Sequence, residues 1–315
     1  MEIAVCIATY QRSHGLRRLL ESLVRQSGLD GRFGVIIVDN DPSGSAEEIF
    51  EEFKPSLDEL IYAVEPEPGI PAARNLGVAL ARSRGASIVA FIDDDEAATE
   101  YWLSTLVHRL ENAAADAVSG PVEPIFPGDA PDWVRKTRLF NRSTFADGAE
   151  LTYASTSNAM LRLDAIAGEL EPFDPGFRFS GGSDTMLFLS LRASGKRIVW
   201  EPNALVYEFI PETRISIRWL TARSYRHGIT LARCERLVYG NTRRSLMRGI
   251  KGALQIPAGA VEIAASKIRH DPLWRNGVIR IARGVGTIAG LFGATYEEYG
   301  RTEERDDRSV YQESS

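Results

Sequence analysis

The sequence has few cysteines and no long apolar run, and both absences narrow the class of protein. Its 315 residues include two cysteines, Cys6 and Cys234, too few for a disulfide framework or a four-cysteine zinc site. Cys6 lies in an apolar run and is expected in the core. No segment approaches the ~20 uninterrupted apolar residues of a membrane-spanning helix, and no signal peptide is recognisable. We therefore expect a cytoplasmic protein with reduced cysteines.

Glycine-rich phosphate loops are also missing. There is no G-x-x-x-x-G-K-[ST] motif and no G-x-G-x-x-G motif after the first apolar run. If a nucleotide binds, it binds through other residues. Wholesale disorder is excluded as well, because 44% of the residues are hydrophobic and 25% are charged.

Charge is distributed unevenly along the chain. Residues 212–291 hold 15 of the 37 Lys and Arg residues but 4 of the 43 Asp and Glu residues, a net charge of +11 against −17 for the remainder. An acidic region often holds a divalent metal, whereas a basic helical segment often meets an anionic surface. Nucleic acid is not an expected partner, because the remainder is acidic and no recognised binding motif is present.

Apolar runs and helical spacings alternate over the first 115 residues. We predict strands at 3–8, 35–38, 60–64 and 87–92, and helices at 15–25, 45–53, 72–84 and 99–113. This alternation predicts an α/β fold with a Rossmann-like, mostly parallel sheet and flanking helices.

The pattern loosens beyond residue 116. A Pro-rich, aromatic stretch at 120–138 is typical of loops that line substrate sites. The later elements that we predict are strands at 157–163, 197–200 and 204–207, a helix at 184–194 and a helical extension from 215 onward. The polar end of the chain, 296–315, is predicted to be disordered.

Polar residues follow three of the predicted strands, where open parallel sheets bind ligands. The most informative group is Asp93-Asp94-Asp95, since adjacent carboxylates repel one another unless something neutralises them. Mg²⁺ and Mn²⁺ take oxygen ligands and share them with phosphates. An isolated acidic triplet is more often a solvated turn, but its position directly after an apolar run favours a metal site.

Five motifs in order resemble the inverting glycosyltransferases of family 2. They are Thr9-Tyr10-Gln-Arg12, Asp39-Asn-Asp41, the segment from Gly69 to Gly77 with Arg74-Asn75, Asp93-Asp-Asp95, and Gly181-Gly-Ser-Asp184. Each is weak alone, and together they cover about residues 1–210. The resemblance implies a GT-A fold and a nucleotide-sugar donor, with UDP favoured.

The resemblance also implies residue roles at the donor site. The donor-binding set would be Thr9, Tyr10, Arg12, Asp39, Asp41, Arg74, Asn75, Asp93 and Asp94. Asp39 would accept a hydrogen bond from the base, and Arg74 would reach the diphosphate or order its loop. Asp95, with Asp93, would hold Mn²⁺ or Mg²⁺.

Asp184 matches the family's general base. An acceptor hydroxyl is a poor nucleophile, so a carboxylate must take its proton. Ser183 stands where the family commonly has Glu, which bears on the acceptor site. The same Gly181-Gly182-Ser183-Asp184 run is also typical of a helix N-terminus, so a capping role remains open.

Arg218-Trp219 resembles the Arg-Trp element that contacts acceptor and diphosphate in processive members. The match is partial, because Ile215 stands where Gln or Arg is expected. The start of an amphipathic helix explains the pattern equally well. With Gly181, Gly182 and Ser183, these residues form the candidate acceptor or diphosphate set.

Basic residues recur among apolar ones from about Arg214 to Phe292. This pattern predicts peripheral binding to an anionic membrane surface, on the inner face of the cytoplasmic membrane. A helical appendage packed on the catalytic region is the alternative. The predicted organisation is therefore a catalytic domain at 1–210, a basic helical region at 211–295 and a tail at 296–315.

The predicted activity is metal-dependent, inverting transfer of a sugar, of hexosyltransferase type, to a lipid-linked or glycan acceptor in bacterial polysaccharide assembly. Two alternatives stay open: a non-catalytic nucleotide-sugar-binding module on the same fold, and a transferase with a soluble acceptor.

Overall fold

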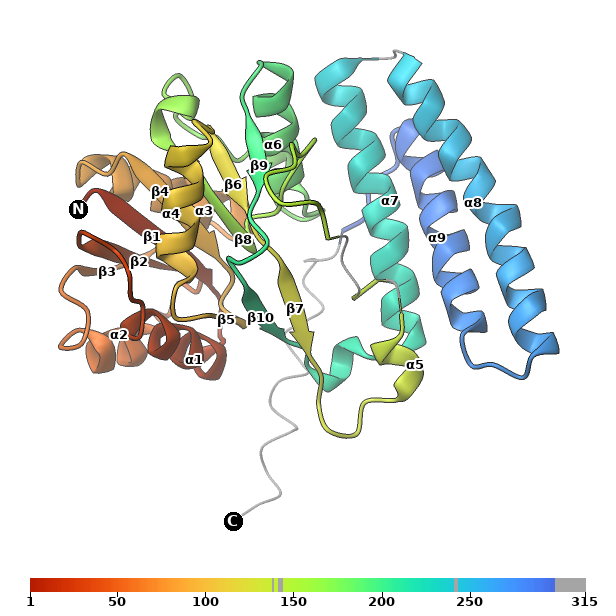
Figure 1. Cartoon of the computed structure of the whole chain (residues 1–315), viewed down its shortest axis with the longest axis horizontal. Coiled ribbons are helices and arrows are strands. Elements are labelled where there is room, and N and C mark those ends of the chain that lie inside the picture. Colours follow the sequence, from red (N-terminus) through yellow and green to blue (C-terminus); the bar gives the residue numbers. More distant parts are fainter. Residues whose placement is uncertain (138, 141–143, 241–242, 298–315) are drawn as a thin grey trace.

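The computed structural model describes residues 1–137, 139–140, 144–240 and 243–297. Most of the tail predicted at 296–315 therefore lies outside the described residues. Figure 1 shows an α/β region built on a twisted sheet and, beside it, a group of three long helices. The fold class predicted from the sequence is confirmed.

The main sheet has seven strands in the order β3-β2-β1-β4-β8-β6-β9. They are β1 (Ile3–Thr9), β2 (Phe33–Asp39), β3 (Leu60–Val64), β4 (Ile88–Ile92), β6 (Ala117–Ser119), β8 (Asn158–Arg162) and β9 (Ile198–Trp200). β8 runs antiparallel to both of its neighbours, β4 and β6. The other adjacent pairs in this sheet are parallel.

Helices cover both faces of this sheet. They are α1 (Ser13–Val24), α2 (Glu47–Phe53), α3 (Ile70–Ser83), α4 (Trp102–Asn112) and α6 (Ser183–Ala193). Alternate residues of β1 point into different layers because side chains of a strand alternate between faces. Val5 and Ile7 pack in the core with α1, α2 and α4, while Ala4 and Cys6 pack with α3 and α6. Cys6 is buried in the core, as expected from the sequence. This burial raises the pKa of its thiol.

A second sheet of three strands joins the α/β region to the C-terminal helices. It consists of β5 (Glu96–Ala98), β10 (Val206–Phe209) and β7 (Val122–Ile125), with β10 in the middle. The Phe209 amide donates to the carbonyl of Asp95 (3.0 Å). β10 therefore connects the end of the aspartate triplet to the chain that enters the helices. The shorter helical elements are α5 (Asp132–Arg135), η1 (Leu163–Ile166), η2 (Pro175–Phe177) and η3 (Glu212–Arg214).

Three helices form the C-terminal region: α7 (Ile217–Tyr239), α8 (Arg243–Ile268) and α9 (Trp274–Leu291). α7 lies against α6, and α9 packs on both α7 and α8 (Figure 1). Backbones approach closely at glycines: a Cβ on Gly259 would lie 2.6 Å from the Gly277 carbonyl oxygen, and one on Gly286 would lie 2.0 Å from that of Tyr225. Within the described residues, no helix is long and apolar enough to span a bilayer.

The predicted elements agree with the structure apart from some short strands and the exact ends of several elements. β5 and β6 have three residues each, and β7 lies inside the Pro-rich stretch that we expected to be a loop. The strand expected at 204–207 begins two residues later, at Val206. The helix expected at 99–113 begins at Trp102.

Candidate active site

The aspartate triplet follows β4, beside the end of β1 in the main sheet. Asp94 is buried, and it accepts hydrogen bonds from the Thr9 hydroxyl (2.8 Å) and from Arg12 Nη1 (3.0 Å). Burial raises the pKa of Asp94 to about 6, the Arg12 charge opposes this shift, and the Asp95 charge adds to it. Parallel pairing of β1 with β4 brings Thr9 and Arg12 to this carboxylate. The structure thus brings together three residues predicted for the donor site.

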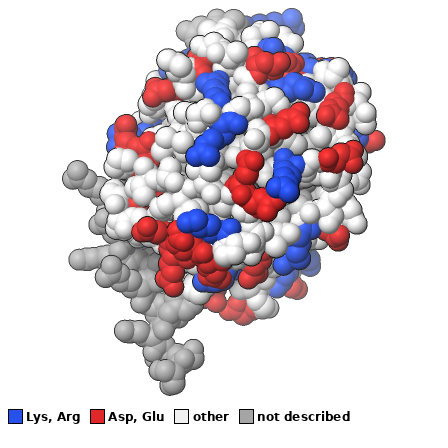
Figure 2. Space-filling model, turned by 90° about the vertical axis from the view of Figure 1, so that its left-hand side faces the viewer, with Lys and Arg blue, Asp and Glu red and all other residues white. Residues whose placement is uncertain are grey.

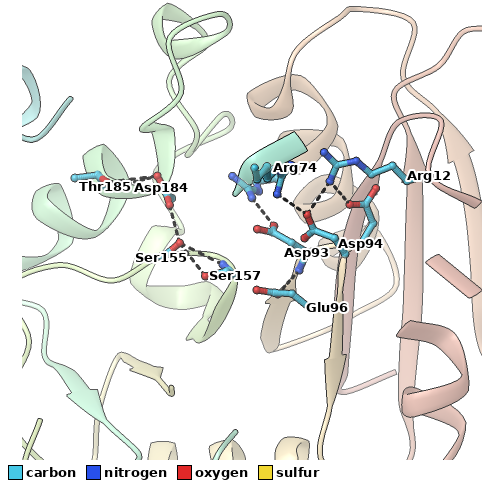
Figure 3. Close-up of polar contacts among 11 residues, drawn as sticks. Arg12, Arg74, Asp93, Asp94, Glu96, Ser155, Ser157, Asp184 and Thr185 are labelled. Atoms are coloured by element: carbon cyan, nitrogen blue, oxygen red, sulfur yellow. Dashed lines mark hydrogen bonds and ion pairs between the residues drawn. The ribbon is translucent and has the colours of Figure 1, made fainter. Parts of the chain in front are cut away.

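Arginines from separate elements pair with the other two aspartates. Oδ2 of Asp95 accepts from Arg12 Nη1 and from Arg214 Nη1, each at 3.0 Å. Asp93 accepts from Arg74 Nη2 at 2.9 Å. Figure 3 shows Arg12 and Arg74 converging on the triplet from opposite sides. Guanidinium charges therefore neutralise the repulsion that the sequence implies.

Glu96 is a buried acid that the sequence prediction missed. Its Oε2 accepts from the Asp93 amide (2.8 Å), while Oε1 is buried with no hydrogen-bond partner among the described residues. Antiparallel pairing of β5 with β10 sets Glu208 opposite Glu96. Burial raises the pKa of Glu96 well above its ordinary value, and the charges of Asp93, Glu208 and Asp95 act in the same direction. Through its hydrogen bond with the Asp93 amide, Glu96 fixes the backbone at the start of the triplet.

Asp184 lies in the first turn of α6, after two glycines with positive φ. A Cβ on Gly182 (φ 100°) would meet Cγ2 of Thr230 in α7 at 2.2 Å, so the close approach of α7 requires glycine there. Asp184 accepts from the Ser155 hydroxyl (3.0 Å) through Oδ2 and from the Thr185 amide (2.7 Å) through Oδ1 (Figure 3). The N-cap is Gly182, so Asp184 is not the capping residue. One of its oxygens nonetheless binds backbone, and the other faces Ser155.

Asp39 and Asp41 organise the turn after β2. Asp39 is fully buried and accepts from the Ala46 amide (2.7 Å) and the Tyr62 hydroxyl (3.0 Å). Burial tends to raise the pKa of Asp41, but hydrogen bonds, chiefly from Ser43, outweigh burial and lower it. Tyr10, the residue after β1, is exposed. Base recognition by this group stays a prediction, since these carboxylates are engaged within the protein.

Asn75 is buried and binds the backbone of Phe173 twice. Its Nδ2 donates to the Phe173 carbonyl (2.8 Å), and its Oδ1 accepts from the Phe173 amide (2.9 Å). Arg74, the preceding residue, lies over the Phe173 ring at 5.8 Å. Asn75 therefore fixes the loop against which Arg74 packs, a positioning role that the sequence did not indicate.

Arg218 and Trp219 lie at the start of α7. Arg218 lines a shallow groove of about 510 Å³ between α7 and α9. Trp219 stacks on Phe140, with ring centroids 6.5 Å apart, and Arg214 lies 5.9 Å from its ring. The ion pair with Asp95 is made by Arg214, which the sequence prediction did not place in the site. The one sequence feature that could have indicated Arg214 is its position four residues before Arg218.

The chemistry of the triplet fits a divalent cation that is shared with a substrate. Both ion pairs of Asp95 use Oδ2, and Asp93 is partly exposed. Among the described residues, no three His, Cys, Asp or Glu side chains form a complete metal site. Mg²⁺ is commonly held by one or two carboxylates, with substrate phosphates and water completing its ligands.

The sequence has clear relatives. Residues 4–168 match the family described as Glycosyl transferase family 2. The chain is 32% identical over 307 residues to the succinoglycan biosynthesis protein ExoM of Rhizobium meliloti, covering 96% of each chain. It is 26% identical over 252 residues to the glucosyl-dolichyl phosphate glucuronosyltransferase of Haloferax volcanii, covering 72% of this chain and 75% of the relative.

A solved structure shares the fold over nearly the whole chain. Residues 1–349 of S. aureus TarS, in complex with UDP, match with a TM-score of 0.55 and 16% identity. The match covers 94% of this chain and 93% of that one. At this identity the likeness concerns the fold alone.

Proposed function

The chain belongs to glycosyl transferase family 2 and is a glycosyltransferase, and we propose that it transfers a sugar, with inversion, from a UDP-linked donor to an acceptor hydroxyl. The observation that carries the proposal is the meeting of Thr9, Arg12 and the aspartate triplet at adjoining strand ends. One relative and one protein of similar fold add support, since ExoM is named for succinoglycan biosynthesis and TarS was solved with UDP.

In the proposed donor complex, Asp95 and Asp93 would hold Mn²⁺ or Mg²⁺ with the diphosphate. Such a cation supplies positive charge against the charge that develops on the departing diphosphate. Arg12, Arg74 and Arg214 already lie at the triplet, and they would turn toward the phosphates once these arrive. When the donor binds, these three arginines would exchange their carboxylate partners for phosphate oxygens of the donor.

Asp184 would act as the general base. Its Oδ2 contacts only a neutral hydroxyl, Ser155, among the hydrogen bonds described, so an acceptor hydroxyl can replace that serine as donor. The amide of Thr185 binds the other oxygen and fixes the carboxylate plane. Removing the proton as the new glycosidic bond forms raises the nucleophilicity of the acceptor oxygen.

The acceptor in this proposal is a glycan or lipid-linked saccharide, met at the inner face of the cytoplasmic membrane. The named substrate of the Haloferax relative contains a dolichyl phosphate, and the ExoM relative belongs to polysaccharide biosynthesis by name. The proposed organisation is a catalytic domain at 1–210, to which 211–295 adds helices next to Asp184.

Asp95→Asn tests the metal and donor assignment. Asn keeps the shape of the Asp95 side chain but removes the negative charge that binds a cation. UDP should raise the melting temperature of the wild type more with Mn²⁺ than without it, because a ligand of the native state stabilises that state. The variant should lose the Mn²⁺-dependent part. An equal Mn²⁺ effect in both proteins would contradict the assignment.

Asp184→Asn tests catalysis separately from binding. We expect normal stabilisation by UDP with Mn²⁺ and a fall in transfer of about 10²–10⁴-fold, the usual contribution of a general base. Release of UDP in the presence of a glycan acceptor measures the rate. Near-normal turnover would return Asp184 to a structural role, and no turnover in the wild type with any acceptor would favour the binding-module alternative.

A further inference from the structure

An apolar stripe runs along the outside of α8. Its large members are spaced by four or seven residues, which places them on one helical face. They are Leu246 (65% exposed), Ile250 (45%), Leu254 (61%), Val261 (67%) and Ile268 (79%). Figure 1 shows α8 at the outer edge of the helical region, away from the main sheet. Leaving so much apolar area in water is unfavourable, and continuous stripes of this kind mark interaction surfaces.

The opposite face of α8 is fixed against α9 by small residues. Gly252 and Gly259 are buried there, and a Cβ on Gly284 would lie 2.6 Å from the Gly252 carbonyl oxygen. Such close backbone packing sets the rotation of α8 about its axis. The stripe therefore cannot turn inward without separating the two helices.

Charges beside the stripe are basic. Lys251 and Lys267 are exposed and lie on opposite sides of it, each about 100° around the helix from its centre. The one acidic residue of α8, Glu262, is paired with Arg280 of α9. Arg248 is likewise paired, with Glu235 of α7. The outward face of α8 therefore carries positive charge, although Arg248 and Arg280 form ion pairs within the helical region.

The opposite end of the molecule lacks this character. Acidic and basic side chains are intermingled over the face shown in Figure 2, with no large area of one sign. On α8, by contrast, an apolar stripe and two exposed lysines, Lys251 and Lys267, lie together.

We propose that the outer face of α8 binds the surface of an anionic lipid bilayer. The apolar stripe would enter the boundary between headgroups and acyl chains, while Lys251 and Lys267 would meet anionic headgroups, as in interfacial helices. A second copy of this chain is the alternative occupant, and the sedimentation experiment below distinguishes the two. This inference rests on the proposed function in one respect: membrane binding would bring the enzyme to a lipid-linked acceptor.

Vesicle binding tests the proposal without any assay of transfer. The full-length protein is sedimented with vesicles of phosphatidylcholine alone or with phosphatidylglycerol added, at low and high salt. We expect binding that requires the anionic lipid and weakens with salt. Lys251→Ala and Lys267→Ala should each reduce the partition coefficient about fivefold at low salt.

The matched pair of variants is Leu254→Glu in the stripe and Leu170→Glu in the α/β region. Leu170 is 88% exposed, so both changes replace an exposed leucine by the same acid. Leu254→Glu should lower partitioning at least about tenfold, and Leu170→Glu should leave it unchanged. Far-ultraviolet circular dichroism and the melting temperature verify that each variant is folded.

Three results would overturn the proposal. The first is no binding of the wild type to anionic vesicles at low salt. The second is an equal loss in both leucine variants. The third is a concentration-dependent dimer, seen by sedimentation velocity without lipid, that Leu254→Glu dissociates, because the stripe would then be a protein interface. Vesicle binding by a protein without transferase activity would refute the proposed function and leave this inference standing.

Discussion

Arg214 connects the aspartate triplet to the C-terminal helices. It comes from the turn η3, pairs with Asp95 and lies against Trp219 at the start of α7. Asp95 in turn shares Arg12 with Asp94. A cation that approached Asp95 would meet two guanidinium groups already bound there, and like charges disfavour one another at such distances.

Replacing Arg214 by Gln should therefore strengthen metal binding in the absence of donor. Loss of one competing positive charge at a partly exposed pair corresponds to roughly threefold to tenfold tighter Mn²⁺ binding, measured by isothermal titration calorimetry. Arg32→Gln is the control, because Arg32 forms an exposed pair with Asp58. Weaker Mn²⁺ binding in Arg214→Gln would show that Arg214 supports the metal site.

Several site residues were predictable because they follow strands directly. Thr9, Arg12 and the triplet belong to strand ends of one sheet, so their meeting follows from the parallel pairing of β1 and β4. Glu96, Ser155 and Arg214 were not predictable. Glu96 is placed by the antiparallel pairing of β5 with β10. Ser155 comes from a loop before β8, and Arg214 comes from a turn more than a hundred residues from Asp95.

At the scale of elements, the first four strands were predictable and the position of β8 was not. Local periodicity shows that residues 158–162 are extended, but direction and neighbours depend on distant contacts. Asn158 supplies these contacts: its Nδ2 donates to the carbonyls of Pro121 (2.8 Å) and Ala204 (2.7 Å). Trp102 Nε1 donates to its Oδ1 (2.9 Å). One buried amide thus ties β8 to three separate segments.

The packing of α8 on α9 makes Gly259 sensitive to any side chain. A Cβ there would meet the Gly277 carbonyl oxygen and Cγ1 of Ile281, each at 2.6 Å. Gly259→Val should lower the free energy of unfolding by about 2–3 kcal/mol, in the range seen for overpacked cores. Urea denaturation followed by circular dichroism measures this loss.

Ala253→Val is the control on the same helix, because Ala253 is exposed. Its cost should be at most about 0.7 kcal/mol, a matter of helix propensity alone. Equal effects of the two substitutions would mean that α8 and α9 are not in close backbone contact in solution.

At the scale of the whole molecule, the two predicted domains share a core. Phe177 and Leu189 of the α/β region pack with Leu231 and Cys234 of α7. A second cluster joins Val134 and Phe140 to Leu220 and Ile279 of the helices. The first of these clusters includes residues of α6, whose first turn carries Asp184.

We therefore expect the α/β region and the C-terminal helices to unfold together. Differential scanning calorimetry should give one transition in which the calorimetric and van't Hoff enthalpies agree. UDP with Mn²⁺ should move that whole transition to higher temperature. Two separate transitions, of which UDP shifts only one, would instead establish 1–210 and 211–295 as independent folding units.

The place of β8 has a consequence for the growing polypeptide on the ribosome. β8 lies between β4 and β6 but is synthesised after both. Until residues 158–162 emerge, the inner edge of β4 has unpaired amides and carbonyls, and β6 has no partner. Exposed strand edges of this kind attract other chains. We therefore expect the half-made protein to be most prone to aggregation while residues 92–162 are being synthesised, a property that the finished sheet does not reveal.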